Sequence, residues 1–352
     1  MIEADFIQNL VRESLRGIKP YATARDEFKG EASIFLDANE NSLGSPAGDG
    51  MNRYPDPYQL ALKQAISKIK GVPPQNIFLG NGSDEAIDLL FRIFCEPGKH
   101  NAVVCPPTYG MYEVSAAINN VEVRKAVLDD AFDLDIETIQ KLIDKNTRLI
   151  FVCSPNNPTG NAMTRIKIET LLNGFNGLVV IDEAYGNYSR HRSFIPELTE
   201  YTNLVVMQTF SKAWGMAGIR LGMAFACEDI ISWFNKIKPP YNVNELTQQT
   251  ALQALPKVNE VNTWIKEIVD ERKKLAQTLP GLSGVLKVYE SEANFLLVKF
   301  KNATEVFNQL LKSGIVVRDR SNAVKCEGCL RITIGTVEEN KVMISELKQI
   351  LA

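Results

Sequence analysis

The sequence predicts an α/β fold, a mostly parallel sheet between helices that is followed by a smaller α+β unit. Between residues 76 and 226, short runs rich in Val, Ile and Leu alternate with amphipathic stretches. This alternation is typical of a parallel sheet covered by helices on both faces. After about residue 245 the pattern changes to one long helical stretch followed by fewer strands. We therefore expect a large sheet domain and a separate, smaller domain.

The expected elements follow this rhythm along the chain. Residues 1–45 predict an N-terminal arm that also forms part of the small domain and includes the turn-rich NENSLGSPAGDG. Residues 46–245 form the expected large domain, whose apolar runs are NIFLG, NAVVC, VEVRKAV, RLIFVC, GLVVID, NLVVMQ and GMAFA. Residues 246–352 form the expected small domain, with strand-like ANFLLVKF, IVVRD and LRITIG and a closing helix from about 337.

Composition excludes several classes of partner. Lys and Arg number 39 against 42 Asp and Glu in 352 residues, a net charge of −3, so no nucleic-acid partner is expected. No apolar stretch of this chain approaches the ~20 residues that span a bilayer. The acidic start MIEADFIQNL does not look like a signal peptide. We expect a cytoplasmic protein with no membrane partner.

The cysteines predict no metal site. Only Cys326 and Cys329 are spaced like metal or redox ligands, and the sequence has no second pair of this kind. We interpret all six cysteines as ordinary thiols in a reducing compartment.

Polar residues gather after five of the expected strands. The segments that follow them are NGSDEA, PPTYGMY, SPNNPTG, DEAYGNY and TFSKAWG. In open parallel sheets, ligands bind at the carboxyl ends of the strands. Each segment alone is also compatible with a plain turn. Together they predict one site built from five loops.

Three of these segments offer groups for a phosphorylated aromatic ring. Ser83 and Asp84 open a helix whose free amides bind phosphate, although both residues also suit a simple helix cap. Asp182 ends an apolar strand, where a carboxylate needs a cation or a strong donor such as a protonated pyridine nitrogen. The alternative is that it caps the next turn. Tyr185 can donate to a phenolate oxygen.

Asn157 and Tyr109 suit the same ring. Asn157 lies between two prolines and can donate its side-chain amide to a ring oxygen, and Tyr109 can stack on a flat ring. A rigid Asn-Pro turn and an aromatic core residue are the respective alternatives.

Lys212 discriminates between these interpretations. In TFSKAWGMAGIRLG, Lys212 and Arg220 stand among small and apolar residues, although cations are almost never fully buried without a partner. A neutral lysine can form a Schiff base with an aldehyde. Arg220 and Ser211 can hold a phosphate. The cofactor that uses all of these groups is pyridoxal 5′-phosphate.

The order SPNNPTG, DEAY, TFSK and GIRLG resembles the fold-type I aminotransferases. Within their class II, the chain is most similar to the histidinol-phosphate aminotransferase family, through KPY at 19–21, LDANEN at 36–41, RYPDP at 53–57, GNGSDE at 80–85, IVVRD at 315–319 and CLRITIGT at 329–336. The resemblance covers nearly the whole chain. It implies a seven-stranded sheet, a homodimer and pyridoxal-phosphate-dependent transfer of the amino group of L-histidinol phosphate to 2-oxoglutarate. This step of histidine biosynthesis yields imidazole acetol phosphate and L-glutamate.

The resemblance also implies roles for single residues. The expected catalytic residues are the Schiff-base lysine Lys212, the pyridine-nitrogen partner Asp182 and the ring-oxygen donor Tyr185. Further expected cofactor contacts are Ser83, Asp84, Tyr109, Asn157, Ser211, Arg220 and, from the neighbouring subunit, Tyr54. The expected substrate contacts are Tyr21, Asn39, Glu40, Arg318 and Arg331, and no metal ligand is implied.

Some alternatives stay open. Either Arg318 or Arg320 supplies the second anion contact, because segment 319–328 varies in kind among such enzymes. An aromatic amino-acid aminotransferase and a threonine-phosphate decarboxylase would use the same cofactor pocket. The presence of Lys212 disfavours a non-catalytic regulator on this scaffold. A nicotinamide dehydrogenase is disfavoured because no expected strand is followed by a G-x-G-x-x-G turn.

Overall fold

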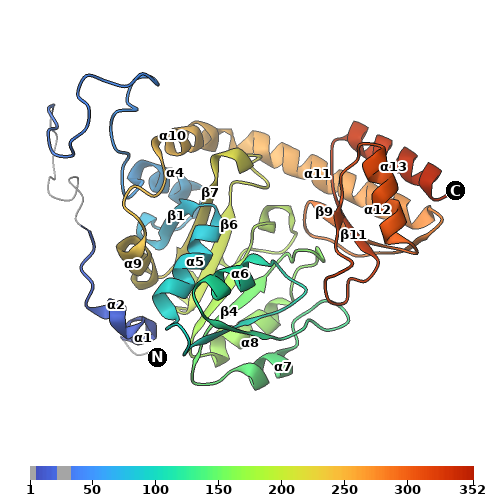
Figure 1. Cartoon of the computed structure of the whole chain (residues 1–352), viewed down its shortest axis with the longest axis horizontal. Coiled ribbons are helices and arrows are strands. Elements are labelled where there is room, and N and C mark those ends of the chain that lie inside the picture. The colour runs from blue at the N-terminus through green and yellow to red at the C-terminus, as the bar shows by residue number, and fades with distance from the viewer. Residues whose placement is uncertain (1–4, 22–32) are drawn as a thin grey trace.

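The computed structural model describes residues 5–21 and 33–352, which form two sheets in separate parts of the molecule (Figure 1). The larger sheet has seven strands in the order β1-β7-β6-β5-β4-β2-β3. They are β1 (Ile77–Asn81), β2 (Asn101–Val104), β3 (Glu122–Lys125), β4 (Thr147–Cys153), β5 (Leu178–Asp182), β6 (Leu204–Thr209) and β7 (Leu221–Ala226). All neighbours pair in parallel except β7, which is antiparallel to β1 and β6. The predicted mostly parallel α/β sheet is confirmed.

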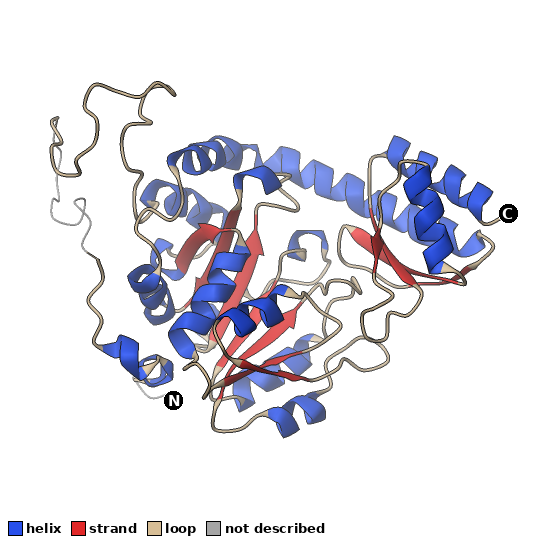
Figure 2. Cartoon of the chain, in the orientation of Figure 1, coloured by secondary structure: helices blue, strands red, loops and turns tan. Residues whose placement is uncertain are grey.

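Helices cover both faces of this sheet (Figure 2). One face carries α5 (Ser83–Phe94), α6 (Met111–Ile118) and α9 (Glu228–Ile237), with α1 (Phe6–Leu10) beside them and the short α2 (Glu13–Arg16) following α1. The other face carries α4 (Leu60–Lys70), α7 (Ile136–Leu142), α8 (Arg165–Gly174) and α10 (Glu245–Ala254). Successive strand residues alternate between faces, and Val180 joins the first core while Ile181 joins the second. The side chains of Asp182 and Glu183 therefore point to opposite faces of the sheet.

The smaller sheet is antiparallel, with the order β10-β11-β9-β8. Its strands are β8 (Val285–Val288), β9 (Phe295–Phe300), β10 (Arg318–Asp319) and β11 (Cys329–Thr333). Helices α11 (Val258–Thr278), α12 (Ala303–Lys312) and α13 (Val337–Ile350) pack on one side of it. Leu330 and Ile332 point into this helix-covered core. The side chain of Arg331, which lies between them, points from the opposite face of the sheet toward the large domain.

Two expected elements differ from the structure. The helical stretch after residue 245 is broken, because Pro256 lies in a turn between α10 and α11 and cannot continue a helix. Of the expected strand over 315–319, only Arg318–Asp319 (β10) pairs with another strand, while Ile315 and Val317 pack against the small-domain core. Short 3₁₀ helices occupy Pro74–Asn76, Gly186–Tyr188, Ile195–Thr199, Ala217–Ile219, Leu255–Lys257 and Leu279–Gly281.

Part of the N-terminal arm runs apart from the rest of the chain and rejoins it where the Tyr54 ring stacks on the Tyr241 ring, with 4.6 Å between the centroids (Figure 1). In this segment, residues 33–54, Ile34, Leu36 and Leu43 are 74%, 82% and 98% exposed. Residues 1–4 and 22–32 of the expected arm lie outside the described residues, and the three domain limits stay predictions. No helix within the described ranges is long and apolar enough to cross a membrane.

Candidate functional site

A cavity of about 350 Å³ lies between the strand ends of the large sheet and the β10–β11 ribbon of the small one. Its walls are formed by Gly82, Ser83, Asp84, Tyr109, Cys153, Asn157, Asp182, Ala184, Tyr185, Thr209, Ser211, Lys212, Ala217, Arg220, Arg318, Arg320 and Arg331. Every predicted site residue from Ser83 onward is among them. The loops that follow five strands thus meet in one place, as the sequence predicted.

Asp182 is the buried carboxylate of this cavity, with 3% of its surface exposed. Its Oδ2 accepts a hydrogen bond from the Tyr112 hydroxyl at 2.7 Å, and its Oδ1 accepts one from the Ala184 N–H at 3.0 Å. Both donors are uncharged. Burial raises the pKa of Asp182 to about 6, although the Tyr112 hydrogen bond acts in the opposite direction. A cationic group placed beside this carboxylate would therefore be strongly stabilised.

The start of α5 forms another part of the wall. Arg220 adopts a left-handed conformation (φ 53°) just before β7, and its Nη2 lies 3.8 Å from Oδ2 of Asp84. A Cβ on Gly82 would lie 2.8 Å from Nη2 of Arg220. A Cβ on Gly222 would lie 2.2 Å from the nitrogen of Ser83. Only glycine lets the backbone, the first helical amides and the guanidinium come this close.

Lys212 follows β6 and lines the cavity, where solvent reaches part of its side chain while the surrounding wall partly buries the amine. Its Nζ lies 5.6 Å from the centre of the Tyr185 ring. Burial lowers the pKa of Lys212, and the positive charge of Arg331 lowers it further, while Asp182 raises it. The net lowering increases the neutral fraction of the amine, which is the form that acts as a nucleophile or base.

Arg331 connects the small domain to the loop after β4. Its Nη1 donates a hydrogen bond to Oδ1 of Asn157. The amide nitrogen of Asn157, a donor only, is thereby directed to another acceptor. Burial raises the pKa of Tyr185, so its hydroxyl stays protonated and is a second donor.

Four predicted residues do not line this cavity within a single chain. Tyr21 is 74% exposed and Tyr54 is 52% exposed. Asn39 and Glu40 belong to the arm segment 33–54, where the Glu40 carboxylate accepts a hydrogen bond from the Tyr54 N–H at 2.7 Å. The expectation that Tyr21, Asn39 and Glu40 line the substrate end is thus not met inside one chain, because the arm runs apart from the small domain (Figure 1).

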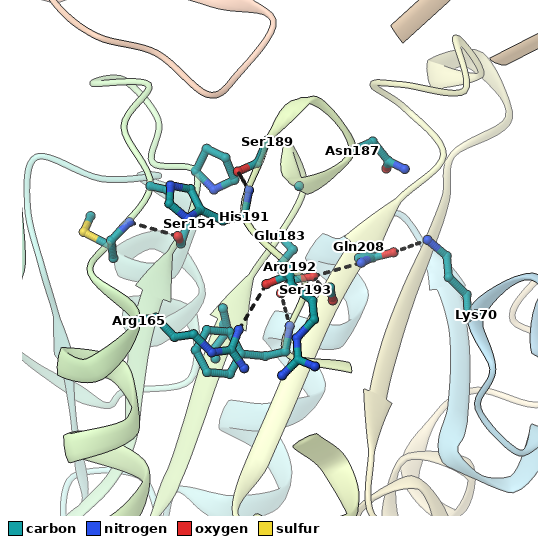
Figure 3. A pocket seen from close by; sticks show the side chains of 16 residues that line it. Lys70, Ser154, Arg165, Glu183, Asn187, Ser189, His191, Arg192, Ser193 and Gln208 are labelled. Carbon is teal, nitrogen blue, oxygen red and sulfur yellow. Dashed lines mark hydrogen bonds between the residues drawn. The ribbon is translucent and has the colours of Figure 1, made fainter. Parts of the chain in front are cut away.

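A larger cavity of about 430 Å³ lies on the opposite face of the same strand ends (Figure 3). Glu183 accepts hydrogen bonds there from Oγ of Ser193 at 2.5 Å and Nε2 of Gln208 at 2.9 Å. Gln208 in turn accepts one from Nζ of Lys70 at 2.6 Å. The glutamine amide thus bridges a buried ammonium and a buried carboxylate behind the Asp182 strand.

The arginines of this larger cavity are paired as well. Arg165 and Arg192 both form ion pairs with Glu197, and Arg165 also pairs with Glu169 at 3.0 Å. Its charges are balanced by one another, so this cavity supports the strand ends rather than offering charge to a ligand. The smaller cavity, whose charges are not balanced in this way, is the better candidate site.

The comparisons with known proteins agree with this geometry. The family described as aminotransferase class I and II matches residues 31–347. A histidinol-phosphate aminotransferase of Christiangramia forsetii is 52% identical, over 98% of both chains. This chain belongs to the histidinol-phosphate aminotransferase family.

Two solved structures of histidinol-phosphate aminotransferases share the fold of this chain. That of the histidinol-phosphate aminotransferase from Clostridium acetobutylicum has a TM-score of 0.79 and 26% identity, over 85% of this chain and 91% of that one. That from Sinorhizobium meliloti, in complex with pyridoxal-5′-phosphate, has a TM-score of 0.79 and 23% identity, over 89% of both chains. The predicted family and fold type are confirmed.

The sequence did not predict every residue of the site. Tyr112, which holds Asp182, lies three residues after Tyr109 in the first turn of α6 and is fully buried. A tyrosine at an apolar helix position was the available signal, because its buried hydroxyl needs a partner. Arg318 and Arg320 both line the cavity, so the choice between them for the second anion contact stays open.

Proposed function

We propose that this chain is a pyridoxal 5′-phosphate-dependent transaminase that transfers the amino group of L-histidinol phosphate to 2-oxoglutarate. The products are imidazole acetol phosphate and L-glutamate, and the step belongs to histidine biosynthesis. The observation that carries the proposal is a single cavity that joins Lys212, a buried Asp182 with uncharged partners and three arginines of the small domain.

The residues of the cavity fit the cofactor. Asp182 suits a protonated ring nitrogen, because its carboxylate is buried between two neutral donors. The space beside Gly82 and Arg220, which a Cβ would fill, suits the phosphate. The remaining contacts would come from Ser83, Asp84, Tyr109, Asn157, Tyr185, Ser211 and Lys212. When bound, the cofactor supplies an electron sink for the negative charge left when a C–H bond next to the substrate amine breaks.

The side chains of the cavity perform the proton transfers and the positioning. The Lys212 amine, kept partly neutral by its lowered pKa, accepts the proton from the Cα of the amino donor. In the second half-reaction it returns a proton to the Cα of the glutamate that forms. Asp182 would hold a proton on the ring nitrogen, and the Tyr112 hydroxyl and the Ala184 N–H fix the orientation of its carboxylate. Asn157 and Tyr185 would donate hydrogen bonds to the ring oxygen.

One pocket must accept two unlike substrates. Histidinol phosphate has no carboxylate, whereas glutamate has two. Guanidinium groups bind phosphate and carboxylate through the same paired N–H donors. Arg318 and Arg331, which line the cavity next to each other, therefore suit either anion.

We also propose a cytoplasmic homodimer in which the arm of one chain completes the site of the other. The exposed apolar side chains of the arm support a protein partner. The exposed position of Tyr54 outside its own cavity supports contact with the cofactor phosphate of the second copy. Six unpaired cysteines support a reducing compartment.

An amino-donor assay tests the proposed function. Purified holoenzyme is given histidinol phosphate, histidine, phenylalanine or tyrosine, each with and without 2-oxoglutarate. We expect glutamate to form fastest with histidinol phosphate and only when 2-oxoglutarate is present. Preference for phenylalanine or tyrosine would indicate an aromatic amino-acid aminotransferase. Loss of carbon dioxide from threonine phosphate, offered as a fifth substrate without 2-oxoglutarate, would indicate a decarboxylase.

A further inference from the structure

Three arginines leave the same face of the β10–β11 ribbon. Arg318 and Arg331 lie directly opposite each other in the antiparallel register. Arg320 lies two residues beyond Arg318, so its side chain leaves the same face, and its backbone N–H bonds the Cys329 carbonyl at 2.9 Å. All three side chains line the candidate cavity. Like charges directly opposite each other on paired strands destabilise a sheet, so this arrangement requires compensation.

The nearby carboxylate does not provide that compensation. Asp319 separates Arg318 from Arg320 in sequence but lies opposite Leu330 in the ribbon, and Leu330 points into the helix-covered core. Asp319 therefore leaves the other face, where its Oδ1 accepts a hydrogen bond from the Ser321 N–H at 2.8 Å. The two carboxylates that line the cavity, Asp84 and Asp182, belong to the cofactor end.

Arg320 has a donor with no acceptor. Its Nε is buried and has no hydrogen-bond partner among the described residues. Burial and the positive charges of Arg331 and Arg318 lower the pKa of Arg320, yet a guanidinium stays protonated near neutral pH. A buried, charged and unsatisfied donor is costly unless a ligand supplies the acceptor.

The number of arginines matches the chemistry of one anion. A carboxylate offers two oxygens and one charge, which a single guanidinium can bind in bidentate fashion. A phosphate monoester offers three terminal oxygens and carries two charges above its second pKa of about 6. Three guanidinium groups on one face of the ribbon therefore suit a phosphate dianion better than a carboxylate.

We propose that Arg320 is a specificity residue that binds the substrate phosphate together with Arg318 and Arg331, and that it makes the pocket select amines carrying a phosphate dianion over amines carrying one carboxylate. The proposal rests on the proposed function, because it takes the phosphate ester to be the amino donor. L-Histidine, which shares the imidazole but carries one carboxylate, is the matched competitor.

The test compares the wild-type holoenzyme with Arg320→Gln at pH 5.0 and 7.5. In the wild type, KM for histidinol phosphate falls as the pH rises through about 6, because the dianion forms. Arg320→Gln raises this KM at pH 7.5 by about tenfold or more, the usual effect of losing a charged hydrogen bond, and flattens its pH dependence. The dissociation constant for L-histidine, measured by spectral titration, differs by less than about threefold between the wild type and Arg320→Gln. Arg320→Lys, which keeps the charge without the planar fork, gives an intermediate KM.

Lys325→Gln is the control for a lost charge in the same loop. Lys325 pairs with the exposed Asp130 outside the cavity, with 2.8 Å between Nζ and Oδ1. It should leave the KM for histidinol phosphate unchanged. A matching loss of affinity in Lys325→Gln and Arg320→Gln would overturn the proposal, since it would reduce the effect to net charge.

Thermal stabilisation by inorganic phosphate separates the two proposals. In holoenzyme the cofactor phosphate fills its own subsite, so the extra stabilisation by inorganic phosphate reports the ribbon, and Arg320→Gln should reduce it. If histidinol phosphate is a good substrate but Arg320→Gln leaves its KM and the phosphate effect intact, this inference fails alone. If histidinol phosphate is not turned over while phosphate still stabilises through Arg320, the proposed function fails alone.

Discussion

At the scale of single residues, the cavity contains groups that cost stability without a ligand. Asp182 is the clearest example, because the hydrogen-bond donors to its buried carboxylate among the described residues are the Tyr112 hydroxyl and the Ala184 N–H. Its pKa rises from 3.8 to about 6 on folding. The folded chain therefore binds this proton more tightly than the unfolded chain. The contribution to stability is full below pH 3.8 and is lost as the pH rises through about 6.

Asp182→Asn should therefore stabilise the cofactor-free protein at pH 8 while abolishing transamination. The shift of about two pKa units corresponds to an upper value of roughly 3 kcal/mol. Urea unfolding of cofactor-free wild type and variant measures the difference. We expect it to be smaller at pH 5 than at pH 8. A gain that is the same at both pH values would show that the carboxylate charge is not its cause.

Lys212 should be the lysine that is covalently linked to the cofactor. Borohydride reduction followed by peptide mapping should place the added mass on Lys212, and Lys212→Ala should show no fixed cofactor. Lys63 is a demanding comparison, because burial lowers its pKa to about 8 although it does not line the cavity. Fixation on Lys63 or on another lysine would refute the assignment, since position in the cavity and not basicity alone is the proposed reason.

At the scale of elements, the close approach of β7 to the start of α5 shapes the proposed phosphate subsite. Gly222→Ala would place a methyl group 2.2 Å from the backbone of Gly82 and Ser83. The helix start must move away, so we expect weaker cofactor binding with little change in the secondary-structure content. Fluorescence titration of the cofactor-free variant with pyridoxal phosphate measures the affinity. Gly218→Ala, which meets no atom within 4 Å, is the matched control.

The β11 strand presents Arg331 to both proposed substrates. Arg331→Ala should slow both half-reactions, by roughly 2–5 kcal/mol in apparent activation free energy if the charge is desolvated. Single-turnover measurements with histidinol phosphate and with glutamate check this. Normal half-reactions combined with a lower melting temperature would instead show that the arginine only links the domains through its hydrogen bond to Asn157.

The sequence predicted the elements of the large sheet better than their arrangement. All seven strands were found, and in β1, β4 and β5 burial on both faces leaves runs of Val, Ile and Leu. The edge strand β3 is the exception, since it is largely exposed. Strand β8 was missed because it is half-exposed at an edge, and α4, α8 and α9 were not predicted. The insertion of β7 between β1 and β6 depends on pairing between distant segments, which composition does not encode.

The residues of the site were likewise predicted better than the contacts between them. Its strand-end residues were predictable because parallel strands bring their ends together. The convergence of Arg318, Arg320 and Arg331 was not predicted as a unit, because it arises from the register of the β10–β11 ribbon. The Tyr112 contact with Asp182 also arises from packing between a helix and a strand that are far apart in sequence.

At the scale of the whole molecule, the exposed Tyr54 and the arm define the proposed dimer. Tyr54→Phe should weaken cofactor binding by about 0.5–1.5 kcal/mol, the usual contribution of one hydrogen bond. Equilibrium dialysis with pyridoxal phosphate measures this. Mixed dimers of Lys212→Ala and Tyr54→Phe chains should regain one site with wild-type affinity. An active monomer with full cofactor affinity would rule out the shared site.

The separation of the arm from its own cavity also has a consequence for how the enzyme responds to dilution (Figure 1). When each site needs residues from two chains, occupancy of the cofactor and association of the chains are linked by mass action. Added pyridoxal phosphate then favours association, and scarcity of either the cofactor or the chain lowers the activity per chain. The supply of the vitamin-derived cofactor would in this way set the lowest protein concentration at which the pathway step runs.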